Sequence, residues 1–192
     1  MTRPVFILAS SSPRRLALLK DIGIKPDKIV AADIDETPKA NELPRALAKR
    51  LAVKKMHVVA AQEPNGTVLA ADTVVACGRR ILPKAESADE VRKCLELLSG
   101  RRHHVYTAVA IRTADGKIVE RIADSTVIFK QLSSADIDAY VEGKEGIGKA
   151  GGYAIQGMAA AYIRFISGSY SNIVGLPLFD VAQILRGCGY KL

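Results

Sequence analysis

Hydrophobic and polar residues along the chain change repeatedly between the two-residue period of strands and the longer period of helices. Residues 5–9 form the first apolar run and predict a buried strand, and Pro13 and Gly23 mark the start and the end of the helix that follows. Residues 67–76 form a second β-rich run, but Asp72 lies in its middle, and we interpret it as a break in the strand or a turn between two strands. This alternation predicts a mixed α/β protein.

Local signals give the boundaries of the other elements. Ser87-Ala-Asp-Glu90 is a capping-box sequence, and Ser133 with Asp136 resembles a second capped helix start. Asp115-Gly116 between two β-rich runs predicts a hairpin. The pattern thus predicts strands at residues 28–32, 105–112, 118–129 and 161–166, and helices at residues 13–23, 44–61, 87–100, 133–142 and 177–185.

The length and composition are those of an ordinary globular protein. A chain of 192 residues fits one large domain or two small lobes, and 48% apolar with 25% charged residues argues against disorder. No apolar run approaches the ~20 residues that a membrane span needs. The apolar run near the N-terminus is short for a secretory signal, so we expect a cytoplasmic protein with reduced cysteines.

The net charge of +8 makes polyanions and phosphorylated small molecules candidate partners. The basic residues are spread as pairs, such as Arg79-Arg80 and Arg101-Arg102, and do not form a tract. Aromatic residues are only 5% of the chain and tryptophan is absent, so a platform for stacking bases is poorly supplied. The charge therefore fits a solvated surface or a compact phosphate pocket better than a long nucleic-acid groove.

A polar stretch, Ser10-Ser-Ser-Pro-Arg-Arg15, connects the first strand to the first helix. Two arginines in a first turn oppose the helix dipole, which is positive at that end. A phosphate bound at the helix N-terminus would resolve this conflict, and Arg14 and Arg15 would add charge-assisted hydrogen bonds to it. In the alternative interpretation, Ser12 caps the helix and both arginines are solvated.

Two groups of carboxylates are candidates for chemistry. Asp33, Asp35 and Glu36 form a cluster that could hold a hard divalent cation together with substrate phosphates, or could be a solvated loop. Asp72 has small or apolar neighbours, and a carboxylate is costly to bury unless it is paired or bound to a metal. At the end of a strand it could act as a base or a metal ligand.

A glycine-rich segment, Lys149-Ala-Gly-Gly-Tyr-Ala-Ile-Gln-Gly157, is the fourth candidate. Its glycines allow close approach of the backbone, and Gln156 offers a donor and an acceptor to the edge of a base. A plain loop is the alternative, and the segment is not a P-loop. Together, the cations, carboxylates and amide favour a metal-dependent enzyme that acts on a nucleotide.

The ordered set of motifs resembles the Maf proteins, a family of nucleoside triphosphate pyrophosphatases. The motifs are SSSPRR, the loop acid before TP, RLAVKK, AADTVV, PKAESADEV, LSGRRHHVYTAVA, KAGGYAIQG and GSYSNIVGLP. They extend over nearly the whole chain. The form KAGGYAIQG, with glutamine, resembles the branch that acts on dTTP and UTP.

The resemblance implies roles for individual residues. Asp72 matches the proton acceptor, and Arg14, Thr73 and Gln156 match positions associated with substrate choice. Other matching polar residues of the pocket are Ser10, Ser12, Arg15, Glu36, Lys55 and Lys84. Asp72 and Glu36 would hold a divalent cation, Mg²⁺, Mn²⁺ or Co²⁺. Two departures concern Ala85, where many members have proline, and Gly148, where many have aspartate.

The resemblance also implies the fold and the reaction. The expected fold is a single elongated α/β domain over residues 1–192, with a central twisted mixed sheet, flanking helices and a cleft between two lobes. The expected reaction converts a nucleoside triphosphate and water to a nucleoside monophosphate and pyrophosphate. We expect a nucleotide substrate, a homodimer, and neither a stable nucleic-acid partner nor a membrane. The alternatives are a different base preference, such as 7-methyl-GTP, or a nucleotide- or nucleic-acid-binding regulator without turnover.

Overall fold

A seven-stranded sheet forms the centre of the computed structural model, which describes residues 3–190. The strands lie in the order β2-β1-β3-β6-β7-β9, and β4 pairs with β3 off this path. β1 is parallel to β2 and β3, and all other pairs are antiparallel, so the sheet is mixed as predicted. Their bounds are β1 Phe6–Ala9, β2 Lys28–Ile29, β3 Thr67–Cys77, β4 Arg80–Leu82, β6 Arg102–Arg112, β7 Ile118–Phe129 and β9 Ile163–Ser167.

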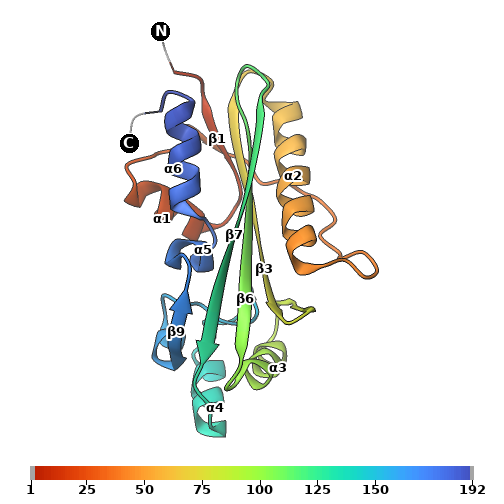
Figure 1. The fold of residues 1–192 in the computed structure, drawn as a ribbon, viewed down its shortest axis with the longest axis vertical. Helices are drawn as coiled ribbons and strands as arrows, with labels where there is room; N and C mark the ends of the chain where they lie inside the picture. Colours follow the sequence, from red (N-terminus) through yellow and green to blue (C-terminus); the bar gives the residue numbers. More distant parts are fainter. Residues whose placement is uncertain (1–2, 191–192) are drawn as a thin grey trace.

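Helices cover both faces of this sheet (Figure 1). α2, Pro44–Gln62, covers one face, where Leu47, Leu51 and Met56 are buried in one apolar cluster with residues of β1, β3 and β6. The other face carries α1, α5 and α6, whose apolar residues belong to a second, larger cluster. Their bounds are α1 Pro13–Asp21, α5 Tyr170–Val174 and α6 Leu178–Gly187.

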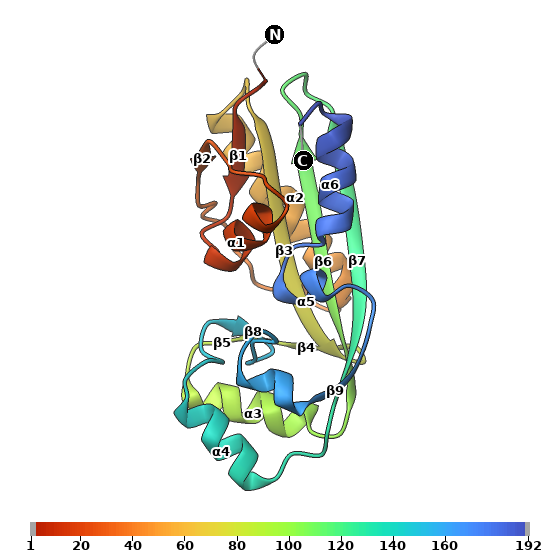
Figure 2. The same ribbon diagram turned by 90° about the vertical axis from the view of Figure 1, so that its left-hand side faces the viewer.

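The long strands β3, β6 and β7 connect two parts of the molecule (Figure 2). The first part contains β1, α1, α2 and α6. The second contains α3, Ala88–Leu98, and α4, Ser134–Glu142, beside a two-stranded sheet of β5, Lys84–Ala85, and β8, Lys149–Ala150. A 3₁₀ helix, η1, Met158–Tyr162, leads into β9.

The predicted interruption of the second β-rich run is wrong. β3 is one continuous strand of 11 residues, and Asp72 lies in its middle, opposite Ala108 of β6. The long antiparallel pairing with β6 satisfies the backbone of β3 and overrides the low strand propensity of one aspartate. β1 ends at Ala9, which pairs with Ala70, so Asp72 lies just beyond the point where β1 turns into the Ser10 loop.

Most other long elements lie where they were predicted. The helices at 44–61 and 133–142 and the hairpin at Asp115-Gly116 are confirmed, and Gly116 has the positive φ of 87° that such a turn requires. The strand predicted at 28–32 has only two residues. Five short elements, β4, β5, β8, η1 and α5, were not predicted, because elements of two to five residues carry no recognisable period.

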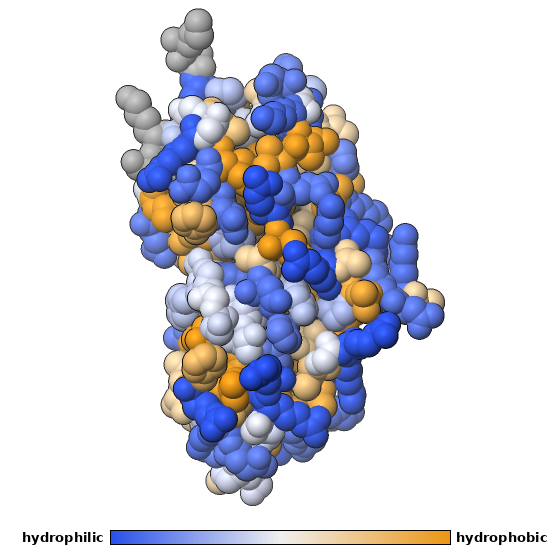
Figure 3. Space-filling view, viewed as in Figure 1, coloured by the Kyte–Doolittle hydropathy of each residue, from blue (hydrophilic) through white to orange (hydrophobic). Residues whose placement is uncertain are grey.

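One face of the molecule can be described from the hydropathy of its residues. Figure 3 shows one face on which hydrophilic residues predominate and apolar residues form small patches between them. Over residues 3–190, none of the helices combines the length and the apolar character that crossing a bilayer requires.

Candidate active site

A cleft of about 1090 Å³ lies where the two parts of the molecule meet. Its walls come from the loop between β1 and α1, from α2 and β3, and from the segments around β5, β8 and α5. All ten site residues named from the sequence line it: Ser10, Ser12, Arg14, Arg15, Glu36, Lys55, Asp72, Thr73, Lys84 and Gln156. Asp33 and Asp35 are exposed and do not line it, although Ala32 and Glu36 of the same loop do.

The start of α1 lines the cleft, and the side chain of its N-cap residue has no capping partner. Ser12 occupies the N-cap position, but its side chain makes no capping hydrogen bond, and the first turn contains no acidic residue. Pro13 is the first helical residue. Ser12 is thus the N-cap residue, as the alternative interpretation has it, but it does not cap through its side chain. Arg15 is not simply solvated, because its guanidinium donates to three protein acceptors.

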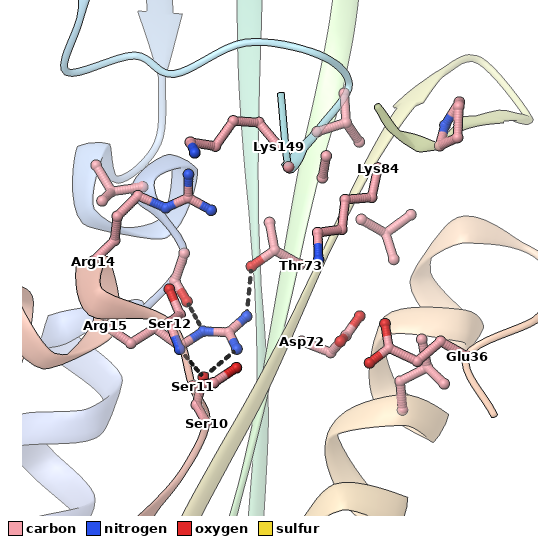
Figure 4. A pocket seen from close by; sticks show the side chains of 18 of the residues that line it. Ser10, Ser11, Ser12, Arg14, Arg15, Glu36, Asp72, Thr73, Lys84 and Lys149 are labelled. Atoms are coloured by element: carbon pink, nitrogen blue, oxygen red, sulfur yellow. Dashed lines mark hydrogen bonds between the residues drawn. The ribbon is translucent and has the colours of Figure 1, made fainter. Parts of the chain in front are cut away.

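Arg15 is held inside the wall of the cleft by three neutral acceptors. Its Nε donates to Gly175 O at 2.9 Å, its Nη1 to Ser10 Oγ at 3.0 Å and its Nη2 to Thr73 Oγ1 at 3.3 Å (Figure 4). Burial lowers the pKa of this guanidinium, which nevertheless stays charged because its ordinary pKa is so high. None of these partners carries a negative charge, so Arg15 contributes a positive potential to the cleft.

Asp72 is the buried acid of the site. Its side chain is 8% exposed, and its Oδ1 lies 2.5 Å from Lys55 Nζ. The same ammonium lies 2.7 Å from Oε1 of the half-exposed Glu36. Burial raises the pKa of Asp72, while the charges of Lys55 and Arg15 oppose that rise. Lys55 thus bridges one buried and one accessible carboxylate.

Three further cations point into the cleft. Arg14 and Lys149 lie close to each other in Figure 4, and Lys84 extends toward Asp72. The pairing of β5 with β8 brings the Lys84 and Lys149 segments together, because Lys84 pairs with Ala150. Burial, and then the charges of Arg14 and Lys84, lower the pKa of Lys149. Within residues 3–190 none of the three forms a salt bridge, and Arg14 Nε is buried without a hydrogen-bond partner.

Lys149 was not among the predicted site residues. It lies in the glycine-rich segment that was singled out, but in the sequence its charge resembles that of any surface lysine. Only the pairing of β5 with β8 places it beside Lys84. At the far end of the same segment, Gln156 is exposed at the rim of the cleft.

The two adjacent histidines of β6 differ in their exposure. His103 is fully buried, and its Nε2 forms a hydrogen bond of 2.8 Å with Tyr153 Oη. His104 is half-exposed and pairs with Asp124 at 2.9 Å. Neither lines the cleft, although Tyr153 does.

The chemistry of the acidic residues fits a hard divalent cation that is shared with a substrate. Over residues 3–190 no cluster of three or more His, Cys, Asp or Glu side chains could form a complete protein cage. Asp72 and Glu36 supply two carboxylates joined through Lys55. Mg²⁺ is commonly bound by one or two carboxylates, with substrate phosphates and water as the other ligands. Two carboxylates beside a cationic cleft match that arrangement.

Comparisons with known proteins give one matching family and several similar relatives. Residues 5–188 match the family described as Maf-like protein. A dTTP/UTP pyrophosphatase of Gluconobacter oxydans is 58% identical over 96% of this chain and 87% of the relative. The dTTP/UTP pyrophosphatase of Rhodospirillum rubrum is 56% identical over 96% and 88%, and that of Caulobacter vibrioides 53% identical over 98% and 97%.

A solved structure shares the fold at low sequence identity. A HAM1 protein from Coxiella burnetii aligns with 94% of this chain and 98% of its own, with a TM-score of 0.55 and 16% identity. This likeness concerns the architecture: a central mixed sheet with helices on both faces.

Proposed function

The chain belongs to the Maf family, and from this premise we propose that it is a nucleoside triphosphate pyrophosphatase acting on dTTP and UTP. The reaction converts the triphosphate and water to the monophosphate and pyrophosphate. One observation supports it most: a buried carboxylate shares the cleft with four cations, Arg14, Arg15, Lys84 and Lys149, that form no salt bridge within residues 3–190. A nucleoside triphosphate supplies the negative charge that those cations lack.

Asp72 is the proposed proton acceptor. Its carboxylate orients a water molecule and accepts a proton from it, while the water oxygen forms a bond to the α-phosphorus. The bond from the α-phosphorus to the bridging oxygen breaks, and this oxygen leaves with pyrophosphate. Lys55 favours the ionised form of Asp72 that this role needs, because its charge opposes the effect of burial.

The cations take the phosphate chain. Arg14, Lys84 and Lys149 neutralise charge that develops on the pyrophosphate as it leaves. Ser10 and Ser12, together with the backbone at the start of α1, add hydrogen-bond donors on the same side. The opposition between two arginines and the helix dipole is then balanced by a bound anion.

A divalent cation, Mg²⁺, Mn²⁺ or Co²⁺, is part of the proposal, with Asp72 and Glu36 as its protein ligands. When bound, it supplies Lewis-acid stabilisation of charge on the phosphate oxygens. Gly148, where many family members have aspartate, adds no carboxylate in this chain. Asp72 and Glu36 therefore carry the binding of the cation.

A nucleotide panel tests the proposed function. The purified chain is incubated with UTP, dTTP, CTP, GTP and 7-methyl-GTP in Mg²⁺, Mn²⁺ or Co²⁺, and pyrophosphate and orthophosphate are measured separately. UTP and dTTP should give the highest kcat/KM and release pyrophosphate. A higher value for 7-methyl-GTP would support the other base preference, and binding without any product would support a regulator. Release of orthophosphate with a nucleoside diphosphate would contradict the mechanism.

A further inference from the structure

A chain of hydrogen bonds runs from Arg15 through β3 and β6 to α5. Arg15 Nη2 donates to Thr73 Oγ1, which lies 3.0 Å from Thr107 Oγ1. Thr107 Oγ1 in turn lies 2.9 Å from the backbone carbonyl oxygen of Asn172. Thr73 and Thr107 are direct partners across β3 and β6, so their side chains lie on the same face. Thr107 is fully buried and lies outside the cleft lining, whereas Thr73 lines the cleft.

The chemistry of the partners determines which atom donates and which accepts in each of these hydrogen bonds. A carbonyl oxygen can only accept, so the single proton of Thr107 is donated to Asn172. Thr107 therefore has no proton left for Thr73, and the hydroxyl of Thr73 must donate to Thr107. Arg15 can only donate, so it occupies one lone pair of Thr73. The remaining lone pair of Thr73 is all that this hydroxyl can offer to a ligand.

Asn172, the last acceptor in this series of hydrogen bonds, is held in place by further buried hydrogen bonds. Asn172 is fully buried, and its Nδ2 donates to Val105 O at 3.0 Å and to Ser125 Oγ at 2.8 Å. Ser125 Oγ in turn accepts from the backbone of Ser169 and donates to its carbonyl. The carbonyl of Asn172 is thus tied to β6 and β7 and cannot move away from Thr107 without breaking several buried hydrogen bonds.

Ser10, on the other side of the same guanidinium, has the opposite character. Its Oγ accepts from Ser12 N at 3.2 Å and from Arg15 Nη1 at 3.0 Å, so both of its lone pairs are used. Its proton remains for an acceptor such as a phosphate oxygen. Two hydroxyls that flank Arg15 therefore differ: Ser10 donates and Thr73 accepts.

We propose that Thr107 is a positioning residue that fixes the Thr73 hydroxyl as a hydrogen-bond acceptor and so directs the nucleoside, not the phosphates, to Thr73. The proposal rests on the proposed function, since it assumes a nucleotide in this cleft. An ionised triphosphate has acceptors only, so within the nucleotide only an N–H or O–H of the base or sugar can donate to Thr73. The nucleotide is thereby oriented in the cleft, with its nucleoside at Thr73 and its phosphates toward Ser10.

Thr107→Val and Thr107→Ser test the proposal. Valine keeps the shape of threonine but removes the acceptor for the proton of Thr73, whereas serine keeps the hydroxyl. Binding is measured by calorimetry with inorganic triphosphate and with the α,β-methylene form of UTP, which cannot release pyrophosphate. Thr107→Val should weaken the UTP analogue about 3- to 10-fold and leave inorganic triphosphate within about twofold, and Thr107→Ser should restore the affinity. Equal losses for both ligands, or for both variants, would overturn the proposal.

Analogues that each lack one donor locate the contact. Three α,β-methylene analogues of UTP are compared: 2′-deoxy, 3′-deoxy and 3-methyl, the last lacking the N3–H. In the wild type, the loss of one of these donors from the ligand should weaken binding about 3- to 10-fold. The loss of the same donor should have less than about a twofold effect in Thr107→Val. Such coupling is not expected from a residue that only supports the fold. If no deletion has an effect in the wild type, or if the effect persists in Thr107→Val, the proposal is wrong.

Hydrolysis and binding test the proposed function and this proposal separately. Hydrolysis of UTP by the wild type decides whether the chain is a pyrophosphatase, and the binding comparison does not depend on turnover. If Thr107→Val does not fold, the three analogues are compared in the wild type and in Thr107→Ser. If the Thr73 hydroxyl accepts a hydrogen bond from the nucleoside, the loss of one donor must weaken binding. A series without any sensitive donor would overturn the proposal in that case as well.

Discussion

At the scale of single residues, the proposed mechanism depends most on Asp72. Asp72→Asn keeps the shape of the side chain but removes the proton acceptor, so kcat for UTP should fall by about 10²- to 10⁴-fold. Asp138→Asn is the matched control, because Asp138 is an exposed carboxylate that pairs with Arg92 far from the cleft lining. An Asp72→Asn enzyme with nearly unchanged kcat would move the role of base to another group.

The pH dependence of the reaction tests the same residue. Burial raises the pKa of Asp72 above its ordinary value of 3.8. The base acts only when ionised, so log kcat/KM should decline as the pH falls through the pKa of Asp72, and the decline should begin at a higher pH when the divalent cation is below saturation, because a bound cation favours the ionised carboxylate. A profile without any acidic decline would contradict an assignment of the base to Asp72.

His103 gives a prediction for stability. Burial lowers its pKa to about 4, against 6.5 for an exposed histidine, so the unfolded chain binds a proton in the range where the folded chain does not. Stability from this group is therefore present above about pH 6.5 and is lost as the pH falls toward 4. The free energy of unfolding should drop by about 2 kcal/mol more in the wild type than in His103→Gln between pH 7 and pH 4.5. An equal drop in the wild type and in His103→Gln would contradict this assignment.

At the scale of elements, the helix starts show which caps serve the fold and which serve the site. Ser133 forms a complete capping box with Asp136 at the start of α4, whereas Ser12 at the start of α1 makes no side-chain capping bond. Ser133→Ala should lower the free energy of unfolding by about 1 kcal/mol in urea titrations. Ser12→Ala should change it by less than about 0.5 kcal/mol but should weaken binding of UTP. A large loss of stability in Ser12→Ala would contradict this division.

The elements also show how far the sequence could predict the structure. The capped helices and the Asp115-Gly116 hairpin follow from local signals, and the structure places them as predicted. The continuity of β3 through Asp72 could not be predicted, because it depends on pairing with β6, which follows 25 residues later. The same holds for the short pairing of β5 with β8 that brings Lys149 to Lys84.

At the scale of the whole molecule, the site lies where separate segments of the chain meet. The motifs named the ten predicted residues that line the cleft, but their relative positions depend on the order of strands in the sheet. The hydrogen bonds through Thr107 could not be predicted from the sequence either, because they require the register of β3 against β6 and the packing of α5 against β6. The homodimer and the cytoplasmic location stay predictions.

The position of the bond that is cleaved tests the central claim most directly. Hydrolysis of UTP is carried out in water enriched in ¹⁸O, and both products are analysed by mass spectrometry. Attack of a water oriented by Asp72 on the α-phosphorus places one ¹⁸O atom in UMP and none in pyrophosphate. Pyrophosphate that carries the label, or UDP with labelled orthophosphate, would contradict the account.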